Sequence, residues 1–550
     1  MSTLQIRPDD SERDPLVMSF WERDTSTDLI DHTVGGLLAE RAVTHAEMTA
    51  LVGTRHGDGA ELRLTYAELY EESLRVATAL RGLVEPGEFV ALWAPNNVEW
   101  PMIQFGAALA GVVLVALNPV LRRTELDYAL EHSGARVLLH ADSSRDYDMA
   151  EVAESIAQER ADLTVISLSE DARWRADAVS AETLADVPSD PAAAVMLQYT
   201  SGTTGKPKGV LLCHRSLVNV AKLTMEYVGI ESGSVAINPL PMFHTAACVV
   251  ATLGPVWVGG TSVLIEQFVP AAVVETARRE RADVLFYVPA ILGAVLESVR
   301  GSEGSAPRLP TIVGGASNVP SAMIEAAERV FGAAVMNLFG QTELSPVLSA
   351  TRRGDSRRDQ LTTVGHPLAQ VECKVIDPVT GEVVPIGEVG EICARGYQQF
   401  LEYWRDPEAT ARALDRDGFV RTGDLGSMDS RGYLTLAGRL KDLIIRGGEN
   451  ISPLEIESAL LAVDGVLDAT VIGLADARLG EVVAAVVRVR GDAAEDLRER
   501  LERHARSVLS PYKVPSRWFL AEELPVTPTG KIRKFQVVDG IENGQFLELL

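Results

Sequence analysis

Strand-like and helix-like segments alternate from about residue 63 to about residue 317, and this alternation constrains the fold more than any other feature. Residues 66–83 carry apolar side chains at three- and four-residue spacing, as an amphipathic helix does. Residues 88–94 (EFVALWA) then form an apolar run that is typical of a buried strand. The same pair of patterns returns at 122–134, where a glycine ends the helix, and at 135–141. Such alternation predicts an α/β fold with a largely parallel sheet covered on both faces.

The pattern changes near residue 370. Residues 370–396 contain short alternating segments separated by turn residues, which predicts a small antiparallel sheet or barrel. After Arg439 the sequence predicts a helix at 453–462, two strands at 466–475 and 481–490, and a further helix near 493–508. This last part of the chain is expected to form a compact α+β unit.

The length of the chain also indicates more than one domain. A chain of 550 residues is too long for one ordinary hydrophobic core. We therefore expect a large N-terminal domain, residues 1–438, built from stacked βαβ-type sheets plus the small antiparallel barrel. Residues 439–550 are expected to form a small C-terminal domain.

Composition excludes several classes of function. Hydrophobic residues make up 46% and charged residues 23% of the chain, which is typical of a globular protein. A net charge of −26 argues against binding to nucleic acid. No apolar run reaches the roughly 18 residues of a spanning helix, and the polar N-terminus does not resemble a signal peptide, so the cytoplasm is the expected location.

The cysteines are scattered, which predicts buried thiols rather than a zinc site or disulfides: Cys213, Cys248, Cys373 and Cys393.

The strongest chemical signal is QYTSGTTGKPKGV at residues 198–210. Three glycines allow backbone N–H groups to approach an anion closely, while four Ser or Thr hydroxyls and two lysines add hydrogen-bond donors and positive charge. This combination suits a triphosphate, although the spacing is not that of a Walker A motif. By composition alone, a flexible surface loop is the alternative interpretation.

The specific string resembles the phosphate loop of the adenylate-forming superfamily. That superfamily includes acyl- and aryl-CoA synthetases, luciferases and the adenylation domains of peptide synthetases. Further stretches that match it follow in the family's order, between residues 63 and 534. The resemblance implies that the C-terminal domain is mobile, and that the ATP phosphates are bound by Thr200, Ser201, Gly202, Thr203, Thr204, Gly205, Lys206 and Lys208.

Three further stretches resemble the segments around the acid and the base of the nucleotide. In PLPMFHTAAC (239–248), His244 is expected at the mouth of the acyl pocket, and the small residues after it leave room for an apolar acyl group. In MNLFGQTELSP (336–346), Thr342 is expected to contact the α-phosphate and Glu343 to bind Mg²⁺. The residues expected around adenine, including those of IVGGAS (312–317), are Gly315, Ala316, Ser317, Asn337, Leu338, Phe339 and Gly340. Ser317 departs from the family, since many members have proline there.

The remaining stretches resemble the ribose site and the mobile domain. Asp424 in FVRTGDLG is expected to accept both ribose hydroxyls, and Arg439 to contact ribose or phosphate. Lys441 occupies the pivot position, and Asp442 is expected to form a structural salt bridge. The positions implied for pantetheine are Gly447, Gly448 and Asn450, and the one implied for adenylation is Lys531 in LPVTPTGKIRK.

Together these segments predict an ATP-dependent acid–thiol ligase that uses ATP, Mg²⁺ and coenzyme A. The carboxylate attacks the α-phosphorus and pyrophosphate leaves; the small domain then rotates about Lys441, and the thiol takes the acyl group while AMP departs. A fatty or other hydrophobic acid is the expected substrate. One alternative is an enzyme that adenylates an aryl or specialised-metabolite acid for a carrier protein or another acceptor; a second is a non-catalytic nucleotide sensor. The oligomeric state stays open, with a homodimer as one option.

Overall fold

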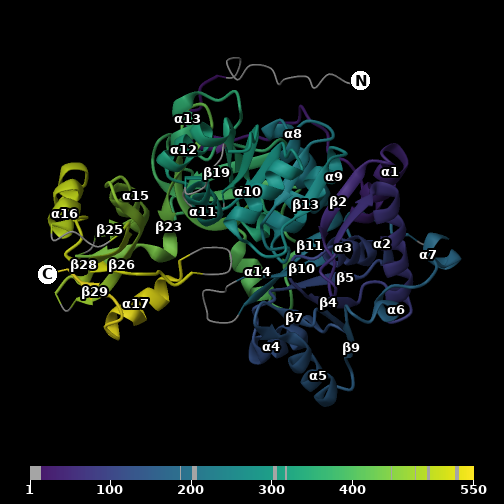
Figure 1. Cartoon of the computed structure of the whole chain (residues 1–550). Coiled ribbons are helices and arrows are strands. Elements are labelled where there is room, and N and C mark those ends of the chain that lie inside the picture. The colour runs from purple at the N-terminus through teal and green to yellow at the C-terminus, as the bar shows by residue number, and fades with distance from the viewer. Residues whose placement is uncertain are drawn as a thin grey trace.

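The computed structural model describes residues 14–185, 187–200, 207–300, 306–315, 319–447, 449–476, 478–491, 496–526 and 532–549. Figure 1 shows a large body formed by the N-terminal part of the chain, with a smaller unit, coloured yellow-green to yellow, beside it. No helix in the described residues is both long and apolar enough to cross a membrane. Helices alternate with the strands of several sheets, so the chain is a mixed α/β protein, as the alternating pattern predicts.

The first large sheet has seven strands, and its central strands are parallel. Its order is β21 (Glu402–Tyr403), β11 (Lys208–Cys213), β10 (Ala194–Thr200), β5 (Val113–Leu117), β4 (Phe89–Trp93), β6 (Val137–His140) and β9 (Thr164–Ser167). The strands from β10 to β9 run parallel, and β11 and β21 are added antiparallel. The intervening helices are α3 (Glu99–Ala110), α4 (Arg123–Ser133) and α5 (Met149–Glu159). Gly134, with φ +75°, ends α4 where the sequence predicts a stop.

The second large sheet has nine strands and is parallel in its centre. Its order is β18 (His366–Pro367), β17 (Ser349–Ala350), β16 (Ala334–Phe339), β15 (Thr311–Gly315), β14 (Val284–Tyr287), β12 (Val235–Asn238), β13 (Thr261–Leu264), β2 (Thr49–Thr54) and β3 (Glu61–Thr65). Antiparallel pairing occurs only towards the two ends, at β16–β17–β18 and β2–β3. Its helices include α8 (His214–Val228), α10 (Pro270–Arg279), α11 (Pro289–Arg300) and α12 (Ser321–Phe331).

Helices α1 (Val34–Thr44), α2 (Tyr66–Arg81) and α3 pack against one another. α2 begins with a capping box, because Thr65 accepts the Glu68 N–H and Glu68 in turn accepts the Thr65 N–H. The short elements of the large body are β7 (Ser143–Ser144), β8 (Tyr147–Asp148), α6 (Asp171–Trp174), α7 (Ala181–Ala185), α9 (Gly254–Trp257), α13 (Arg357–Thr362) and α14 (Pro407–Ala413).

The predicted small antiparallel unit is a five-stranded sheet. Its order is β1 (Phe20–Trp21), β19 (Val371–Ile376), β20 (Gly390–Gly396), β22 (Val420–Met428) and β23 (Leu434–Arg439). Every neighbouring pair is antiparallel. The sheet joins the two ends of the large body, because β1 precedes all of the parallel strands in the chain.

The C-terminal unit contains a six-stranded sheet of β24 (Ile444–Arg446), β25 (Glu449–Ile451), β26 (Val466–Asp476), β27 (Gly480–Val489), β28 (Arg517–Leu520) and β29 (Leu547–Glu548). Its helices are α15 (Pro453–Leu461), α16 (Leu497–Val508) and α17 (Lys534–Glu542). Successive residues of β26 face different cores: Val471 packs with α15 and α16, and Ile472 packs with α17. The sequence does not predict α17, which is short and only weakly amphipathic.

The hydrophobic cores separate near the predicted boundary. The main core of the described residues extends to Leu436. The cores of the C-terminal unit begin at Ile444. This separation supports a division between residues 438 and 439, which we retain as a proposal. All four cysteines are free and buried, as predicted.

Candidate active site

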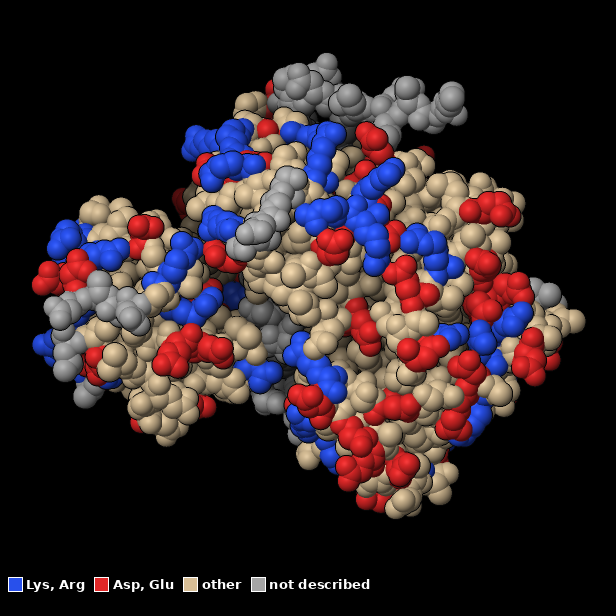
Figure 2. Space-filling view, viewed as in Figure 1, with Lys and Arg blue, Asp and Glu red and all other residues tan. Residues whose placement is uncertain are grey.

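A cavity of about 1230 Å³ lies between the large body and the C-terminal unit. Figure 2 shows the hollow between the two parts, with basic side chains on its rim. The predicted site residues that line it are Gly315, Asn337, Leu338, Phe339, Gly340, Asp424 and Arg439. Residues from four separate segments of the sequence therefore meet at one place.

The ends of β14, β15 and β16 form one side of this cavity. Carboxyl ends of neighbouring parallel strands lie at the same edge of a sheet, which is where α/β proteins bind ligands. Asn337 is buried there, and its Oδ1 accepts a hydrogen bond from the Tyr287 hydroxyl at 2.7 Å. With its oxygen engaged in this way, Asn337 has its amide N–H groups to offer a ligand.

The glycines at the end of β15 also have a structural role. A Cβ atom at Gly314 would overlap the carbonyl oxygen of Tyr287, and one at Gly315 would overlap that of Leu338. The close approach of the neighbouring strands therefore requires glycine at these positions, whether or not a base lies beside them.

Glu343 belongs to a second cluster, at the 3₁₀ turn Thr342–Leu344. The Tyr403 hydroxyl donates a hydrogen bond to Glu343 Oε1 at 2.7 Å, and the Lys208 ammonium lies 4.4 Å from the centre of the Tyr403 ring. Burial, together with the Glu343 carboxylate, raises the pKa of Tyr403, so the phenol stays a donor. Tyr403 was missed from the sequence because sixty positions separate it from Glu343 and no motif links the two.

The geometry of Glu343 fits a magnesium ligand. Mg²⁺ prefers carboxylate oxygens together with phosphate oxygens. The phenol orients one Glu343 oxygen, and the other accepts no hydrogen bond from a described residue. Thr342, one position earlier, is half-buried on the same turn.

Asp424 and Arg439 lie opposite each other on β22 and β23. Arg439 Nε is 2.9 Å from Asp424 Oδ1, and Asp424 is buried. A carboxylate contact with both ribose hydroxyls therefore requires Arg439 to share or release that oxygen.

His244 lies before the π-helix Ala246–Leu253 and is not among the described residues that line the cavity. Its ring is half-buried, with its centre 4.3 Å from that of Phe243. The next residue, Thr245, donates its backbone N–H to Gln198 Oε1 at 3.1 Å. Gln198, on strand β10, thus connects the strand before the glycine-rich segment to the start of the π-helix, a link that the sequence did not reveal.

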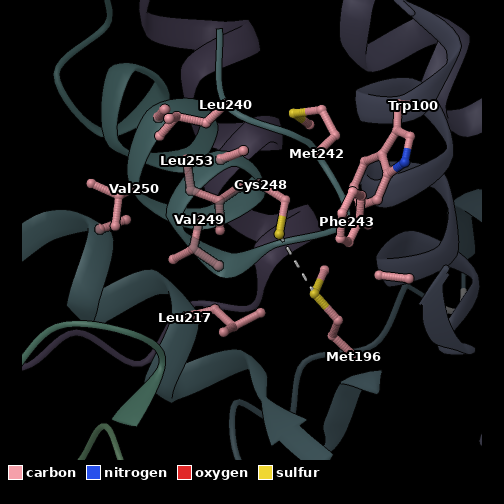
Figure 3. Packing of buried hydrophobic residues seen from close by; sticks show 14 of the residues in the cluster. Trp100, Met196, Leu217, Leu240, Met242, Phe243, Cys248, Val249, Val250 and Leu253 are labelled. Carbon is pink, nitrogen blue, oxygen red and sulfur yellow. Dashed lines mark hydrogen bonds between the residues drawn. The ribbon is translucent and has the colours of Figure 1, made fainter. Parts of the chain in front are cut away.

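The small residues after His244 line the interior of the large body. Cys248 and Val249 are fully buried, and Figure 3 shows them among Met196, Trp100 and Phe243. The Cys248 and Met196 sulfur atoms are 3.8 Å apart. Eight residues in π-helical geometry are rare and occur often at functional sites. The acyl pocket expected here stays a prediction.

The structure explains the hinge residues in part. Lys441 is exposed on the 3₁₀ turn Leu440–Asp442. Asp442 lines the cavity and makes no ion pair with any described residue, so the expected structural salt bridge stays a prediction.

Residues 447 and 448 separate β24 from β25, which pair as a hairpin. Gly447 has φ +61°, which a two-residue hairpin turn requires. The backbone conformation of the turn therefore favours glycine at position 447, in addition to the predicted need for space beside pantetheine. Asn450 is exposed on β25.

The strands β10 and β11 frame the glycine-rich segment. Thr200 and Lys208 lie opposite each other in this pair. The other predicted residues of the segment lie outside the described residues: Ser201, Gly202, Thr203, Thr204, Gly205 and Lys206. The same holds for Ala316, Ser317, Gly448 and Lys531.

Comparison with known proteins identifies the family. The model of the AMP-binding enzyme family matches residues 38–404, and that of its C-terminal domain matches residues 455–531. The chain is 36% identical to a feruloyl-CoA synthase of Amycolatopsis sp, covering 88% of this chain and 94% of that protein. It is 29% identical to the mitochondrial medium-chain acyl-CoA ligase ACSF2 of Macaca fascicularis, covering 96% and 90% respectively.

The fold resembles that of a solved relative over almost its whole length. The anthranilate CoA ligase AuaEII, in complex with anthranoyl-AMP, superimposes with a TM-score of 0.84 at 27% identity, covering 93% of this chain and 98% of that one. The chain therefore belongs to the family of AMP-binding enzymes and is an AMP-forming acid–thiol ligase.

Proposed function

We propose that this ligase activates a hydrophobic carboxylic acid with ATP and transfers the acyl group to coenzyme A. The observation that carries the proposal is the cavity in which Asn337, Phe339, Asp424 and Arg439 meet, beside the turn that bears Glu343. A nucleoside requires a flat apolar contact, amide donors and a ribose acceptor, and these residues supply all three.

The first half-reaction brings two anions together, the carboxylate and the α-phosphate. Lys208 and Thr200 lie opposite each other where the phosphates are expected, and they offer a positive charge and a hydroxyl donor. Glu343 and the phosphate oxygens would hold Mg²⁺, which neutralises phosphate charge when bound. Thr342 is proposed to donate to the α-phosphate. His244 is proposed to lie near the acid carboxylate, at the mouth of the acyl pocket.

The second half-reaction is proposed to use the same site with the small domain turned. Lys531 supports adenylation, and rotation about Lys441 then exchanges it for Gly447, Gly448 and Asn450. The separate hydrophobic cores on either side of residues 439–443 support this, since neither core must open for the rotation.

Two classes of acid are supported by specific observations. The apolar residues of the π-helix, with no acidic side chain to hold an ammonium group, favour an aliphatic acyl group, and one relative is named a medium-chain acyl-CoA ligase. An aryl acid is the second candidate, because feruloyl-CoA and anthranilate CoA ligases are similar over most of the chain. The names of these relatives favour coenzyme A over a carrier protein as the acceptor.

The direct test is to incubate the protein with ATP, Mg²⁺ and one acid at a time, and to follow pyrophosphate release with and without coenzyme A. The panel runs from acetate through long-chain fatty acids to benzoates, cinnamates and amino acids. We expect release with one hydrophobic class and an acyl-CoA product when coenzyme A is present. Release without acyl-CoA would identify another acceptor, and release with amino acids alone would contradict the proposed substrate class.

Lys531→Ala tests whether Lys531 acts in the first half-reaction alone. The variant should lose acid-dependent pyrophosphate release and retain acyl-CoA formation from a supplied acyl-adenylate of the active acid. Equal loss of both half-reactions would contradict the role of Lys531 without contradicting the overall reaction. If the wild-type protein binds ATP and turns over no acid, the nucleotide sensor becomes the better interpretation.

A further inference from the structure

Helix α4 contacts both strands that frame the glycine-rich segment, although none of its residues belongs to a predicted site. The Tyr128 hydroxyl donates a hydrogen bond to the carbonyl oxygen of Pro207 at 2.9 Å. Pro207 immediately precedes Lys208, the first residue of β11. One end of the frame is thus fixed to α4 through a side chain.

A second contact reaches the other strand. Tyr199, one residue before Thr200, donates its hydroxyl hydrogen to the carbonyl oxygen of Ala129 at 3.0 Å. A phenol has one hydrogen to donate, so the Tyr199 oxygen must be the acceptor in the 3.0 Å contact with His132 Nδ1. His132 Nδ1 is therefore the nitrogen that bears the hydrogen in the neutral ring. Burial lowers the pKa of His132 and raises that of Tyr199, so both groups stay neutral in this arrangement.

The rings themselves form one packed unit. Those of Tyr128 and His132 are stacked, with centres 5.4 Å apart and planes at 22°, and Tyr199 contacts His132 edge-on at 5.8 Å. His132 also lies over β11, since a Cβ atom at Gly209 would be 3.5 Å from its ring. Tyr199 and Gly209 are register partners, as are Thr200 and Lys208 immediately beyond them.

The same helix contacts the segment that orients Glu343. Arg405 Nη1 donates to the carbonyl oxygen of Glu131 in α4 at 3.3 Å. Arg405 lies two positions after Tyr403, whose ring contacts Lys208 and whose hydroxyl contacts Glu343. The helix α4 therefore contacts β10, β11 and the segment of Tyr403, whose hydroxyl orients Glu343.

We propose that Tyr128 and His132 are positioning residues that hold Thr200 and Lys208 in place for the β- and γ-phosphates of ATP. This proposal deepens the proposed function and rests on it. Neither residue lines the cavity, so each acts through the strand that it contacts. AMP binds through its nucleoside and α-phosphate alone, so its binding should not depend on these contacts. Comparing AMP with MgATP therefore separates positioning of the phosphate contacts from a general loss of stability.

The test compares MgATP with AMP by isothermal titration calorimetry on the full chain, which requires no knowledge of the acid. Tyr128→Phe removes only the hydroxyl bound to Pro207, and His132→Phe keeps the stacked ring while removing the donor to Tyr199. Each variant should raise the dissociation constant for MgATP about fivefold, the usual effect of one hydrogen bond, and leave that for AMP unchanged. The control is Tyr147→Phe, which removes a hydroxyl that makes no hydrogen bond to a described residue and should alter neither constant.

Two outcomes would overturn the proposal. If MgATP and AMP weaken equally in Tyr128→Phe and His132→Phe, the contacts are merely structural. If neither constant changes, α4 does not position the phosphate contacts at all. Failure of the proposed function is distinguishable, because it would show as the absence of acid-dependent pyrophosphate release by the wild-type protein, whereas this test measures nucleotide binding alone.

Discussion

At the scale of single residues, the Glu343 carboxylate shows how a predicted ligand depends on an unpredicted neighbour. The motif around it indicates a magnesium ligand, but a carboxylate on a short turn can adopt several orientations. Tyr403 selects one of them through a hydrogen bond of 2.7 Å. Groups that orient a metal ligand in this way commonly determine how tightly the metal binds.

Tyr403→Phe is expected to weaken magnesium binding, because Glu343 loses the donor that orients it while the ring stays beside Lys208. The midpoint of a Mg²⁺ titration of pyrophosphate release, at fixed ATP, should rise roughly tenfold. The rate at saturating Mg²⁺ should stay close to that of the wild type. A lower saturating rate with an unchanged midpoint would show that Tyr403 acts in some way other than through the metal ligand.

At the scale of elements, His214 joins two helices. It is the first residue of α8, and its Nδ1 accepts the backbone N–H of Val34, the first residue of α1, at 3.1 Å. Burial lowers the pKa of His214 from 6.5 to about 4, because a charged ring would be poorly solvated and would lose the acceptor.

This contact predicts a pH-dependent stability. The unfolded chain binds a proton at His214 near pH 6.5 and the folded chain only near pH 4, so the contribution is complete above about pH 6.5 and is lost as the pH falls towards 4. The full loss amounts to about 3 kcal/mol of unfolding free energy. His214→Asn keeps an acceptor that does not titrate, so its Tm should fall less than that of the wild type between about pH 7 and pH 5. Parallel slopes for the two proteins would contradict this.

At the scale of the whole molecule, an exposed ion pair joins the two units. Arg490 of the C-terminal unit pairs with Glu297 of α11 at 3.1 Å, and both side chains are exposed. Exposed pairs of this kind contribute little, at most about 1 kcal/mol. The two units are therefore expected to unfold and move as separate bodies, as the division of their cores suggests.

Calorimetry of the full chain should accordingly show two unfolding transitions. Trypsin should cleave the folded protein first after Arg439 or Lys441, since Leu440 and Lys441 are exposed between the two cores. MgATP should slow this cleavage, because a nucleotide bound in the proposed site would contact residues on both sides of the cavity. A single transition, with no early cut in this segment, would contradict the proposed boundary.

The sequence by itself determined the features that depend on local pattern and on the order of motifs. Alternating apolar periods predicted the parallel sheets, the change near residue 370 predicted the antiparallel sheet, and Gly134 predicted the end of α4. The ordered motifs identified the family, and with it the reaction class. These features are readable because hydrophobic periodicity and turn chemistry act over a few residues.

Only the tertiary structure decided which distant side chains meet. Tyr403 with Glu343, Tyr128 with Pro207 and Gln198 with Thr245 are contacts between different elements, and no local pattern encodes them. It also gave Gly447 a role in a hairpin turn. Such pairings depend on how the sheets and helices pack in three dimensions. That packing joins residues far apart in the chain, so no local pattern of a single sequence predicts it.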